Sequence, residues 1–307
     1  MKRDALQIAE SLVAKLWEAF LIRVPYAKAY NDLVTKNGGQ VVLDHLGFRT
    51  LNTHIGEQPA GILGIRHIVE CLGYRLVEKH VLPKKGLKAA YFETESAGVP
   101  KFFVSQLDVA QLPEWVQNLL PDVVADTPYL LSDSGIELLG KLKADGVLNE
   151  EAAEILEEEL VNYFSRAWGP PSRQTVLHVN DVSHYAAWVL LFGNSPSHFA
   201  ASVNNQGIAE WPDIESTCRA LKANGILMKD GIEGEKGSVL QQAATFAAKE
   251  DVIVKVGEEN EEMKWAYAYL ELIQRGFVNE DGQKKLFGGF VDIQERHLYH
   301  LTRTLEN

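Results

Sequence analysis

The chain has 307 residues, with 42 acidic and 30 basic side chains and a formal net charge of −12. This acidity argues against nucleic-acid binding, which depends on clustered Lys and Arg. No apolar run approaches the 18 or more residues of a membrane span, and the N-terminus carries charges where a secretory signal would be apolar. Cys71 and Cys218 lack metal-binding spacing and are typical of reduced core thiols. We therefore expect a cytoplasmic protein without nucleic-acid or membrane partners.

The first part of the chain combines a helical segment with a strand–helix–strand–strand–strand pattern. An apolar helical period over residues 4–35 predicts one helix, which defines an N-terminal segment over 1–36. After the turn residues at 37–39, β-branched and apolar side chains predict a strand over 40–51. The pattern continues with a helix over 61–73 and strands over 74–82, 87–94 and 101–108. These elements form a first βαβββ module, residues 37–110.

A second module follows an acidic helical insert over residues 111–192. A strand is predicted over 198–204 and a helix over 213–225. Further strands are predicted over 226–233, in two runs within 238–256, and over 264–273. The second module, residues 193–307, also carries a C-terminal helix. The fold class is therefore α+β, with two βαβββ modules that curl into half-barrels.

Two histidines stand at matching positions in the two modules. His45 precedes the helix-ending Gly73 by 28 residues (73 − 45), and His198 precedes Gly225 by 27 (225 − 198). Taken singly, each is more typical of a core or surface histidine. Glu271 adds weight, because an unpaired carboxylate inside the apolar run YAYLELI would be costly. Two imidazoles and one carboxylate with open positions are the ligand set of non-haem Fe(II) oxygenases.

Arg49 lies four residues after His45, and alternate residues of a strand share a face. A guanidinium there could bind a carboxylate in bidentate fashion, although the spacing alone is more typical of a surface or ion-pair residue. His297 and His300 are spaced i,i+3 and could bind zinc, but a C-terminal helix with surface histidines is the preferred interpretation. The run GIEGEKGS lacks the order of a phosphate-binding loop.

Several sequence runs resemble the short-type 2-oxoadipate dioxygenase/decarboxylases, long described as a domain of unknown function. They are VVLDHLGFRTL, KFFVSQLDVAQLP, YAAWVLLFGNSPSHFAASVN, GSVLQQAATFA and YAYLELIQRG. The strongest motif is D-H-x-x-[FW]-R at residues 44–49, and the second is of the N-H-F-T-x-S-V-N type at residues 197–204. The resemblance extends from about residue 35 to 300. It implies a vicinal-oxygen-chelate fold, metal ligands at His45, His198 and Glu271, and a substrate-carboxylate contact at Arg49.

The implied activity is oxidative decarboxylation of 2-oxoadipate by O2 to 2-hydroxyglutarate and CO2, a step of lysine catabolism. The implied metal is Fe(II), and Zn, Mn or Ni are other divalent ions for such a site. The chain departs from the family at Gln106, around Gln242 and Thr245 (with Gln241 in the alternative register), and near Gln294. Gln294 is a substrate-binding candidate. These departures leave the chain length of the substrate and the chirality of the product open. The native metal and the oligomeric state are open as well.

Two other classes of function remain open. The scaffold also supports hydrolases, lyases and isomerases that hold Zn(II), Mn(II) or Ni(II), because a fold does not determine a function. Metal identity and oxygen dependence separate these enzymes from the dioxygenase. A non-catalytic protein that binds a small acid is the third class, and the number of polar groups on one face argues against it.

Overall fold

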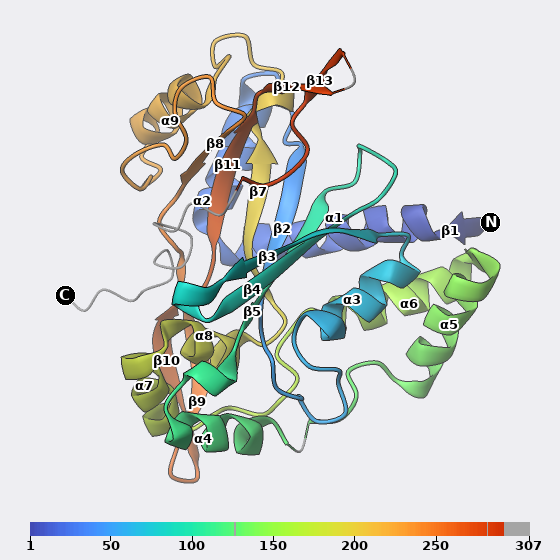
Figure 1. Cartoon of the computed structure of the whole chain (residues 1–307), viewed down its shortest axis with the longest axis vertical. Helices are drawn as coiled ribbons and strands as arrows, with labels where there is room; N and C mark the ends of the chain where they lie inside the picture. The colour runs from blue at the N-terminus through green and yellow to red at the C-terminus, as the bar shows by residue number, and fades with distance from the viewer. Residues whose placement is uncertain (126, 281, 292–307) are drawn as a thin grey trace. The chain divides into compact units, whose positions relative to one another are not determined.

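The computed structural model describes residues 1–125, 127–280 and 282–291, and the α+β fold class is confirmed (Figure 1). The helices are α1 Ala5–Arg23, α2 Pro25–Lys36, α3 Ile62–Cys71, α4 Glu114–Val124, α5 Asp133–Asp145, α6 Glu150–Tyr163, α7 Arg173–Val182, α8 His184–Phe192 and α9 Ile214–Ala223. The strands are β1 Lys2–Asp4, β2 Leu43–Leu51, β3 Arg75–Leu82, β4 Leu87–Glu93, β5 Lys101–Leu107, β6 Val147–Asn149, β7 Pro196–Ser202, β8 Leu240–Ala244, β9 Lys249–Val256, β10 Glu259–Ala266, β11 Tyr269–Arg275, β12 Phe277–Glu280 and β13 Gln283–Leu286.

The chain divides into two compact units, and each unit is assembled from three separate segments. Unit 1 comprises residues 1–18, 47–197 and 251–265. Unit 2 comprises residues 19–46, 198–250 and the residues from 266 onward. Strands β2 and β7 therefore both pass from one unit to the other, at positions 46/47 and 197/198.

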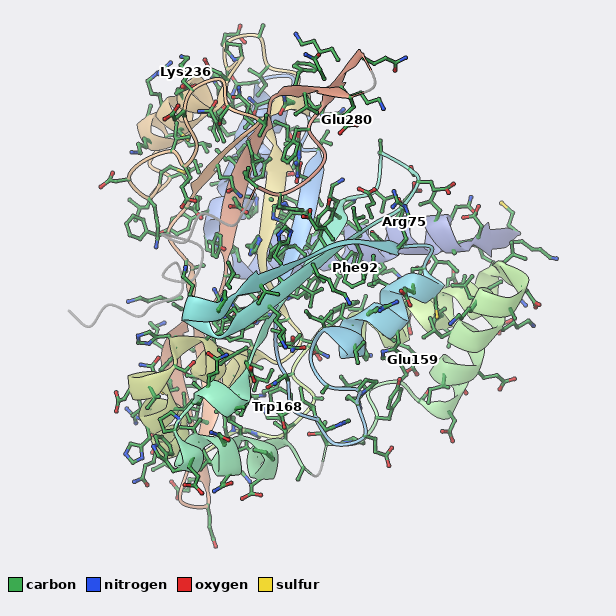
Figure 2. The ribbon with its side chains drawn as sticks, in the orientation of Figure 1. Arg75, Phe92, Glu159, Trp168, Lys236 and Glu280 are labelled. Atoms are coloured by element: carbon green, nitrogen blue, oxygen red, sulfur yellow. The ribbon has the colours of Figure 1, made fainter. Side chains whose placement is uncertain are left out.

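Unit 1 contains the strand order β3-β4-β5-β2, and these strands with α3 follow along the chain in the predicted βαβββ order. The pairs β3–β4 and β4–β5 are antiparallel. Ser105 of β5 donates a hydrogen bond from Oγ to the carbonyl oxygen of Phe48 in β2 (2.9 Å). Phe92 of β4 is fully buried on the side of the strands that α3 covers (Figure 2). Apolar residues on this face account for the attachment of α3.

Glu157 of α6 is a buried carboxylate that ties the N-terminal residues to unit 1. It is 1% exposed and accepts hydrogen bonds from the Arg3 guanidinium, from Ser11 Oγ (2.7 Å) and from Lys15 Nζ (2.8 Å). A buried carboxylate is tolerated only when paired and hydrogen-bonded in this way. Glu157 thus stabilises the contact of α1 with α6.

Glu157→Gln is expected to lower the free energy of unfolding by about 2 kcal/mol, because hydrogen bonds to charged groups contribute roughly 1.5–3 kcal/mol. Urea unfolding followed by circular dichroism measures the change. A loss below about 0.5 kcal/mol would contradict the structural role of this network.

The N-terminal segment is two helices rather than the single predicted helix over residues 4–35. Pro25 occupies the first position of α2, and Val24 is the residue that separates it from α1. Proline lacks the N–H that a continuous helix requires and is favoured at a first helical turn. Residues 2–4 form the short strand β1, which pairs with β6.

Unit 2 contains the strand order β7-β11-β8, and its second module departs from the predicted pattern. Strand β7 runs parallel to β11, and β8 runs antiparallel to β11. Residues 226–233 do not form the predicted strand and make only isolated bridges, at Met228 and Glu233. Gly231 lies within this segment at φ +89°, a left-handed conformation that interrupts an extended strand.

The strand predicted over residues 264–273 is divided between β10 and β11. The backbone N–H of Tyr267 donates to the carbonyl oxygen of Ala248, and the N–H of Ala248 donates to the carbonyl oxygen of Ala268, so regular strand pairing is interrupted at residues 267–268. Trp265 therefore does not share a strand with Glu271, contrary to the prediction. Strands β9 and β10 pair with each other as a separate two-stranded sheet. The predicted C-terminal helix lies outside the described residues.

Both cysteines are free thiols, as predicted, in α3 (Cys71) and α9 (Cys218). Burial raises the pKa of both thiols, that of Cys218 to about 11. Because the thiolate is the reactive form, these side chains behave as core residues. In the part of the chain that the structure describes, no helix combines the length and apolar character needed to cross a bilayer.

Candidate metal site

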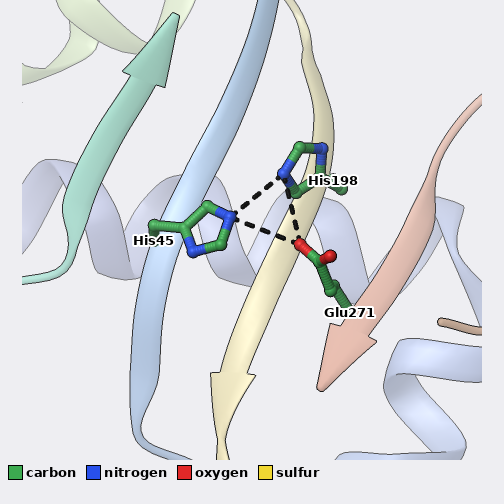
Figure 3. A group of neighbouring side chains, drawn as sticks. All are labelled: His45, His198 and Glu271. Carbon is green, nitrogen blue, oxygen red and sulfur yellow. Dashed lines mark hydrogen bonds and ion pairs between the residues drawn. The ribbon is translucent and has the colours of Figure 1, made fainter. Parts of the chain in front are cut away.

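Three side chains from three strands of unit 2 converge on one point (Figure 3). They are His45 of β2, His198 of β7 and Glu271 of β11, and all three are buried. The Nε2 atoms of the two histidines are 3.2 Å apart. Glu271 Oε2 lies 3.3 Å from His45 Nε2 and 3.6 Å from His198 Nε2. The structure therefore brings together the three residues that the sequence predicts as ligands.

The register of unit 2 explains why these side chains meet. In the parallel pair β7–β11, Tyr269 lies opposite His198, and their rings stack at 5.0 Å with an interplanar angle of 17°. Glu271 lies opposite Ala200 on β7 and opposite Ala244 on β8. Alanine on both sides leaves the carboxylate room on its face of the sheet.

The donor set fits a divalent transition metal. Among the described residues, Oε2 of Glu271 is buried without a hydrogen-bond partner, which costs roughly 1–3 kcal/mol for a neutral polar group and more for a charged one. His45 Nδ1 lies 2.9 Å from Asp44 Oδ1, and an ionised carboxylate can only accept, so Nδ1 carries the proton. In neutral His45, Nε2 therefore presents a lone pair. Two imidazole nitrogens and one carboxylate oxygen are the ligands of the facial triad.

Charges around the triad shift the protonation of His45 and Asp44. Burial by itself raises the pKa of Asp44, but the hydrogen bonds and charges of Arg275 and His45 outweigh it and lower that pKa well below its usual range. Burial lowers the pKa of His45, but Asp44 and Glu271 outweigh it and raise that pKa overall. Metal binding requires the neutral imidazole, so a metal ion and a proton compete for His45.

Asp44 and Arg275 extend the site behind His45, and the sequence analysis assigned neither a role. Arg275 donates from Nε to Asp44 Oδ2 (2.6 Å) and from Nη2 to Asp44 Oδ1 (2.8 Å). Two signals were available in the sequence: Asp44 immediately precedes a ligand, and Arg275 lies four residues after Glu271 on the same strand. Their pairing joins residues 231 positions apart, and spacing alone does not predict such a contact.

Arg49 belongs to unit 1 and is 3% exposed. Its guanidinium carbon lies 5.0 Å from the ring centre of Trp188 and 5.5 Å from that of Tyr185, both on α8. The hydroxyl of Tyr185 is fixed in turn by Ser105 Oγ (2.9 Å) and by the backbone N–H of Thr50 (3.1 Å). The aromatic rings thus hold a buried cation in place. A substrate contact at Arg49 stays a prediction.

Comparison with known proteins identifies the family. The model of the 2-oxoadipate dioxygenase/decarboxylase family matches residues 13–302, nearly the whole chain. The chain belongs to this family. The resemblance found in the sequence is thereby confirmed. No curated protein matched the chain.

Solved structures of similar proteins confirm the fold of this family member. A protein from Ralstonia eutropha JMP134, described as belonging to the glyoxalase superfamily, is 26% identical with a TM-score of 0.84, over 94% of this chain and 87% of that one. Hydroxyglutarate synthase from Oryza sativa, in complex with 2-oxoadipate, is 19% identical with a TM-score of 0.74, over 97% and 93%. The Pseudomonas putida hydroxyglutarate synthase complex is 17% identical with a TM-score of 0.71, over 90% and 66%. The glyoxalase-type, vicinal-oxygen-chelate-like fold is thus confirmed.

The departure from the family pattern around residues 241–245 lies in unit 2, where the roles of three polar side chains are defined by their contacts. Gln242 contacts the triad directly, because its Nε2 donates to Glu271 Oε1 (3.2 Å). Gln241 accepts from the backbone N–H of Gly237 (3.4 Å), and Thr245 accepts from that of Leu270 (3.1 Å). Of the three, Gln242 alone contacts a predicted ligand, and it orients the carboxylate oxygen that does not face the histidines.

Gln106 has a local structural role in this 2-oxoadipate dioxygenase/decarboxylase family member. Its Oε1 accepts from the backbone N–H of Ile62 (2.9 Å), one of the groups that a helix leaves unpaired at its N-terminus. A glutamate at this position has the same acceptor, so the family's Glu and this Gln can cap α3 alike. The substrate candidate Gln294 and the alternative zinc ligands His297 and His300 lie outside the described residues.

Proposed function

We propose that this protein is an Fe(II)-dependent dioxygenase that converts 2-oxoadipate and O2 to 2-hydroxyglutarate and CO2. The observation that carries the proposal is the buried convergence of His45, His198 and Glu271 around a carboxylate oxygen without a hydrogen-bond partner among the described residues. Membership of the 2-oxoadipate dioxygenase/decarboxylase family supports the substrate. The 2-oxoadipate complexes of two hydroxyglutarate synthases with the same fold support it further.

The proposed reaction balances without another reductant. One 2-oxoadipate and one O2 give one CO2 and one 2-hydroxyglutarate. One oxygen atom enters the new carboxylate at the former 2-oxo carbon, and the other enters the hydroxyl. Bound at the triad, Fe(II) supplies a Lewis acid for the 2-oxo group and the one-electron chemistry that O2 requires.

The residues of the chain have separate roles in this proposal. His45 and His198 offer neutral nitrogen ligands, and Glu271 adds one negative charge. Asp44 fixes the tautomer and direction of the His45 ring by accepting its Nδ1 proton. Burial of all three ligands excludes bulk water, which strengthens their interaction with a cation. Arg49 binds the distal carboxylate of the substrate and so sets its orientation.

Oxygen uptake by the purified protein tests the proposal. The protein is stripped of metal, reloaded anaerobically with Fe(II) and mixed with 2-oxoadipate. We expect O2 consumption and CO2 release in a 1:1 ratio, and no uptake by protein reloaded with Zn(II). Bound Fe(II) without uptake or CO2 release would contradict the proposal. Conversion of the acid in the absence of O2 would indicate a lyase or hydrolase instead.

A further inference from the structure

Arg275 of β11 binds Asp44 of β2, which is the carboxylate partner of the neighbouring predicted ligand His45. The planar guanidinium uses Nε and Nη2 to bind both oxygens of Asp44, at 2.6 and 2.8 Å. Asp44 Oδ1 accepts in turn from His45 Nδ1 at 2.9 Å. Arg275 is 6% exposed, so this pair is shielded from water. A bidentate contact of this kind fixes direction as well as distance.

The same guanidinium also holds the segment that follows β13. Its Nη1 donates to the carbonyl oxygens of Phe287 (3.2 Å) and Gly289 (2.7 Å). Phe290, next along the chain, packs edge-on against the His45 ring with a centroid distance of 5.0 Å. One side chain thus orders both the acceptor behind His45 and the aromatic ring beside it.

The backbone of Arg275 is itself fixed. The side-chain oxygen of Asn204 accepts from the Arg275 N–H (2.7 Å), and the side-chain nitrogen of Asn204 donates to the Arg275 carbonyl (2.9 Å). Arg275 is therefore held at the backbone while its guanidinium makes four hydrogen bonds. Because the guanidinium is held in one orientation, it also fixes the orientation of the Asp44 carboxylate.

We propose that Arg275 is a positioning residue that fixes the His45 imidazole for metal binding, acting through Asp44. The inference rests on the proposed metal site. A lysine at this position keeps the positive charge but cannot form the fork that grips both oxygens of Asp44 and two carbonyl groups. The geometry of the guanidinium, and not its charge alone, is therefore what the site requires.

Metal affinity, measured by chelator competition with Zn(II) and Co(II), tests the inference without any assay of turnover. Arg275→Lys and Arg275→Met are each expected to weaken binding by about 10–100-fold, the loss typical of partners that orient a metal ligand. The visible spectrum of bound Co(II) should change in both variants. Arg23→Met is the matched control in unit 2, because the two-point contact of Arg23 is with Glu250 and not with Asp44 or a triad residue. It should bind metal as the wild type does.

Coupling to Asp44 distinguishes positioning from a general loss of stability. Asp44→Asn preserves an acceptor for His45 but replaces one acceptor for Arg275 by a donor. If Arg275 acts through Asp44, Asp44→Asn should lower affinity about as much as Arg275→Lys, and the double variant should lose no more than the larger single loss. Asp44→Asn and Arg275→Lys are also the conservative changes, so they carry the test if Arg275→Met does not fold.

The outcomes distinguish failure of the positioning role of Arg275 from failure of the proposed metal site. Wild-type affinity and an unchanged Co(II) spectrum in Arg275→Lys, or losses that add in the double variant, would overturn the inference while leaving the metal site intact. A wild-type protein that binds neither Zn(II) nor Co(II) would instead contradict the proposed metal site itself.

Discussion

Glu271→Gln is expected to abolish turnover of 2-oxoadipate and to weaken metal binding by more than 100-fold. The variant removes the single anionic ligand of the triad, and even partners behind a ligand contribute about 10–100-fold to affinity. Without metal, the variant should have a free energy of unfolding about 1 kcal/mol higher than that of the wild type. The reason is that the buried oxygen without a partner is replaced by an amide that can donate to a histidine. Chelator competition and urea unfolding of metal-free protein measure the two effects.

The control for Glu271 is Glu157→Gln, which changes the other strongly buried glutamate of the described residues. Glu157 is paired with Arg3 and Lys15, whereas among the described residues the Glu271 carboxylate faces the two histidines and Gln242. The two variants should therefore behave in opposite ways: Glu157→Gln loses stability and keeps metal affinity. A Glu271→Gln variant with wild-type affinity would show that the triad does not bind the metal.

Arg49→Lys is expected to lower kcat/KM for 2-oxoadipate by about 100-fold, and Arg49→Met by at least as much, with metal affinity unchanged. Truncation of one partner of a buried charge pair costs roughly 2–5 kcal/mol, and each 1.4 kcal/mol is tenfold. Lysine loses the bidentate grip and the stacking on Tyr185 and Trp188. Steady-state kinetics of the Fe(II)-loaded variants measure the loss.

A substrate without the distal carboxylate shows which end Arg49 binds. For 2-oxohexanoate, Arg49→Lys should change kcat/KM by less than about threefold, because the contact is already missing. Arg166→Lys is the control in unit 1, since this half-buried arginine donates to the Leu191 carbonyl (3.1 Å) and should leave both substrates unaffected. Equal losses on both substrates would contradict binding of the distal carboxylate.

The sequence was sufficient to predict the three residues of the triad because each carries a local signal. The histidines stand at equivalent points of two similar patterns, and Glu271 is a carboxylate in an otherwise apolar strand. The family resemblance added roles to these positions. Strands β2 to β5 were also predicted within a few residues of their ends, because alternating apolar runs and turn residues are local features.

The remainder depended on contacts between distant residues. The strand periodicity over residues 264–273 could not reveal that β10 pairs with β9 while β11 pairs with β7 and β8, because both halves of the run are apolar. Residues 226–233 were predicted as a strand because of their apolar side chains, and the left-handed backbone of Gly231 is not visible in the sequence. The contact of Asp44 with Arg275 requires the register of three strands, and register is set by tertiary packing.

The division of each unit into three segments has a consequence for synthesis. Unit 1 is completed only by residues 251–265, and unit 2 only by residues after that. During synthesis, strands β2 to β5 therefore emerge long before the last segment of their unit. Contacts of such long sequence separation fold slowly and expose the chain to aggregation. No contiguous fragment contains one complete unit without segments of the other, so truncation does not yield either unit alone.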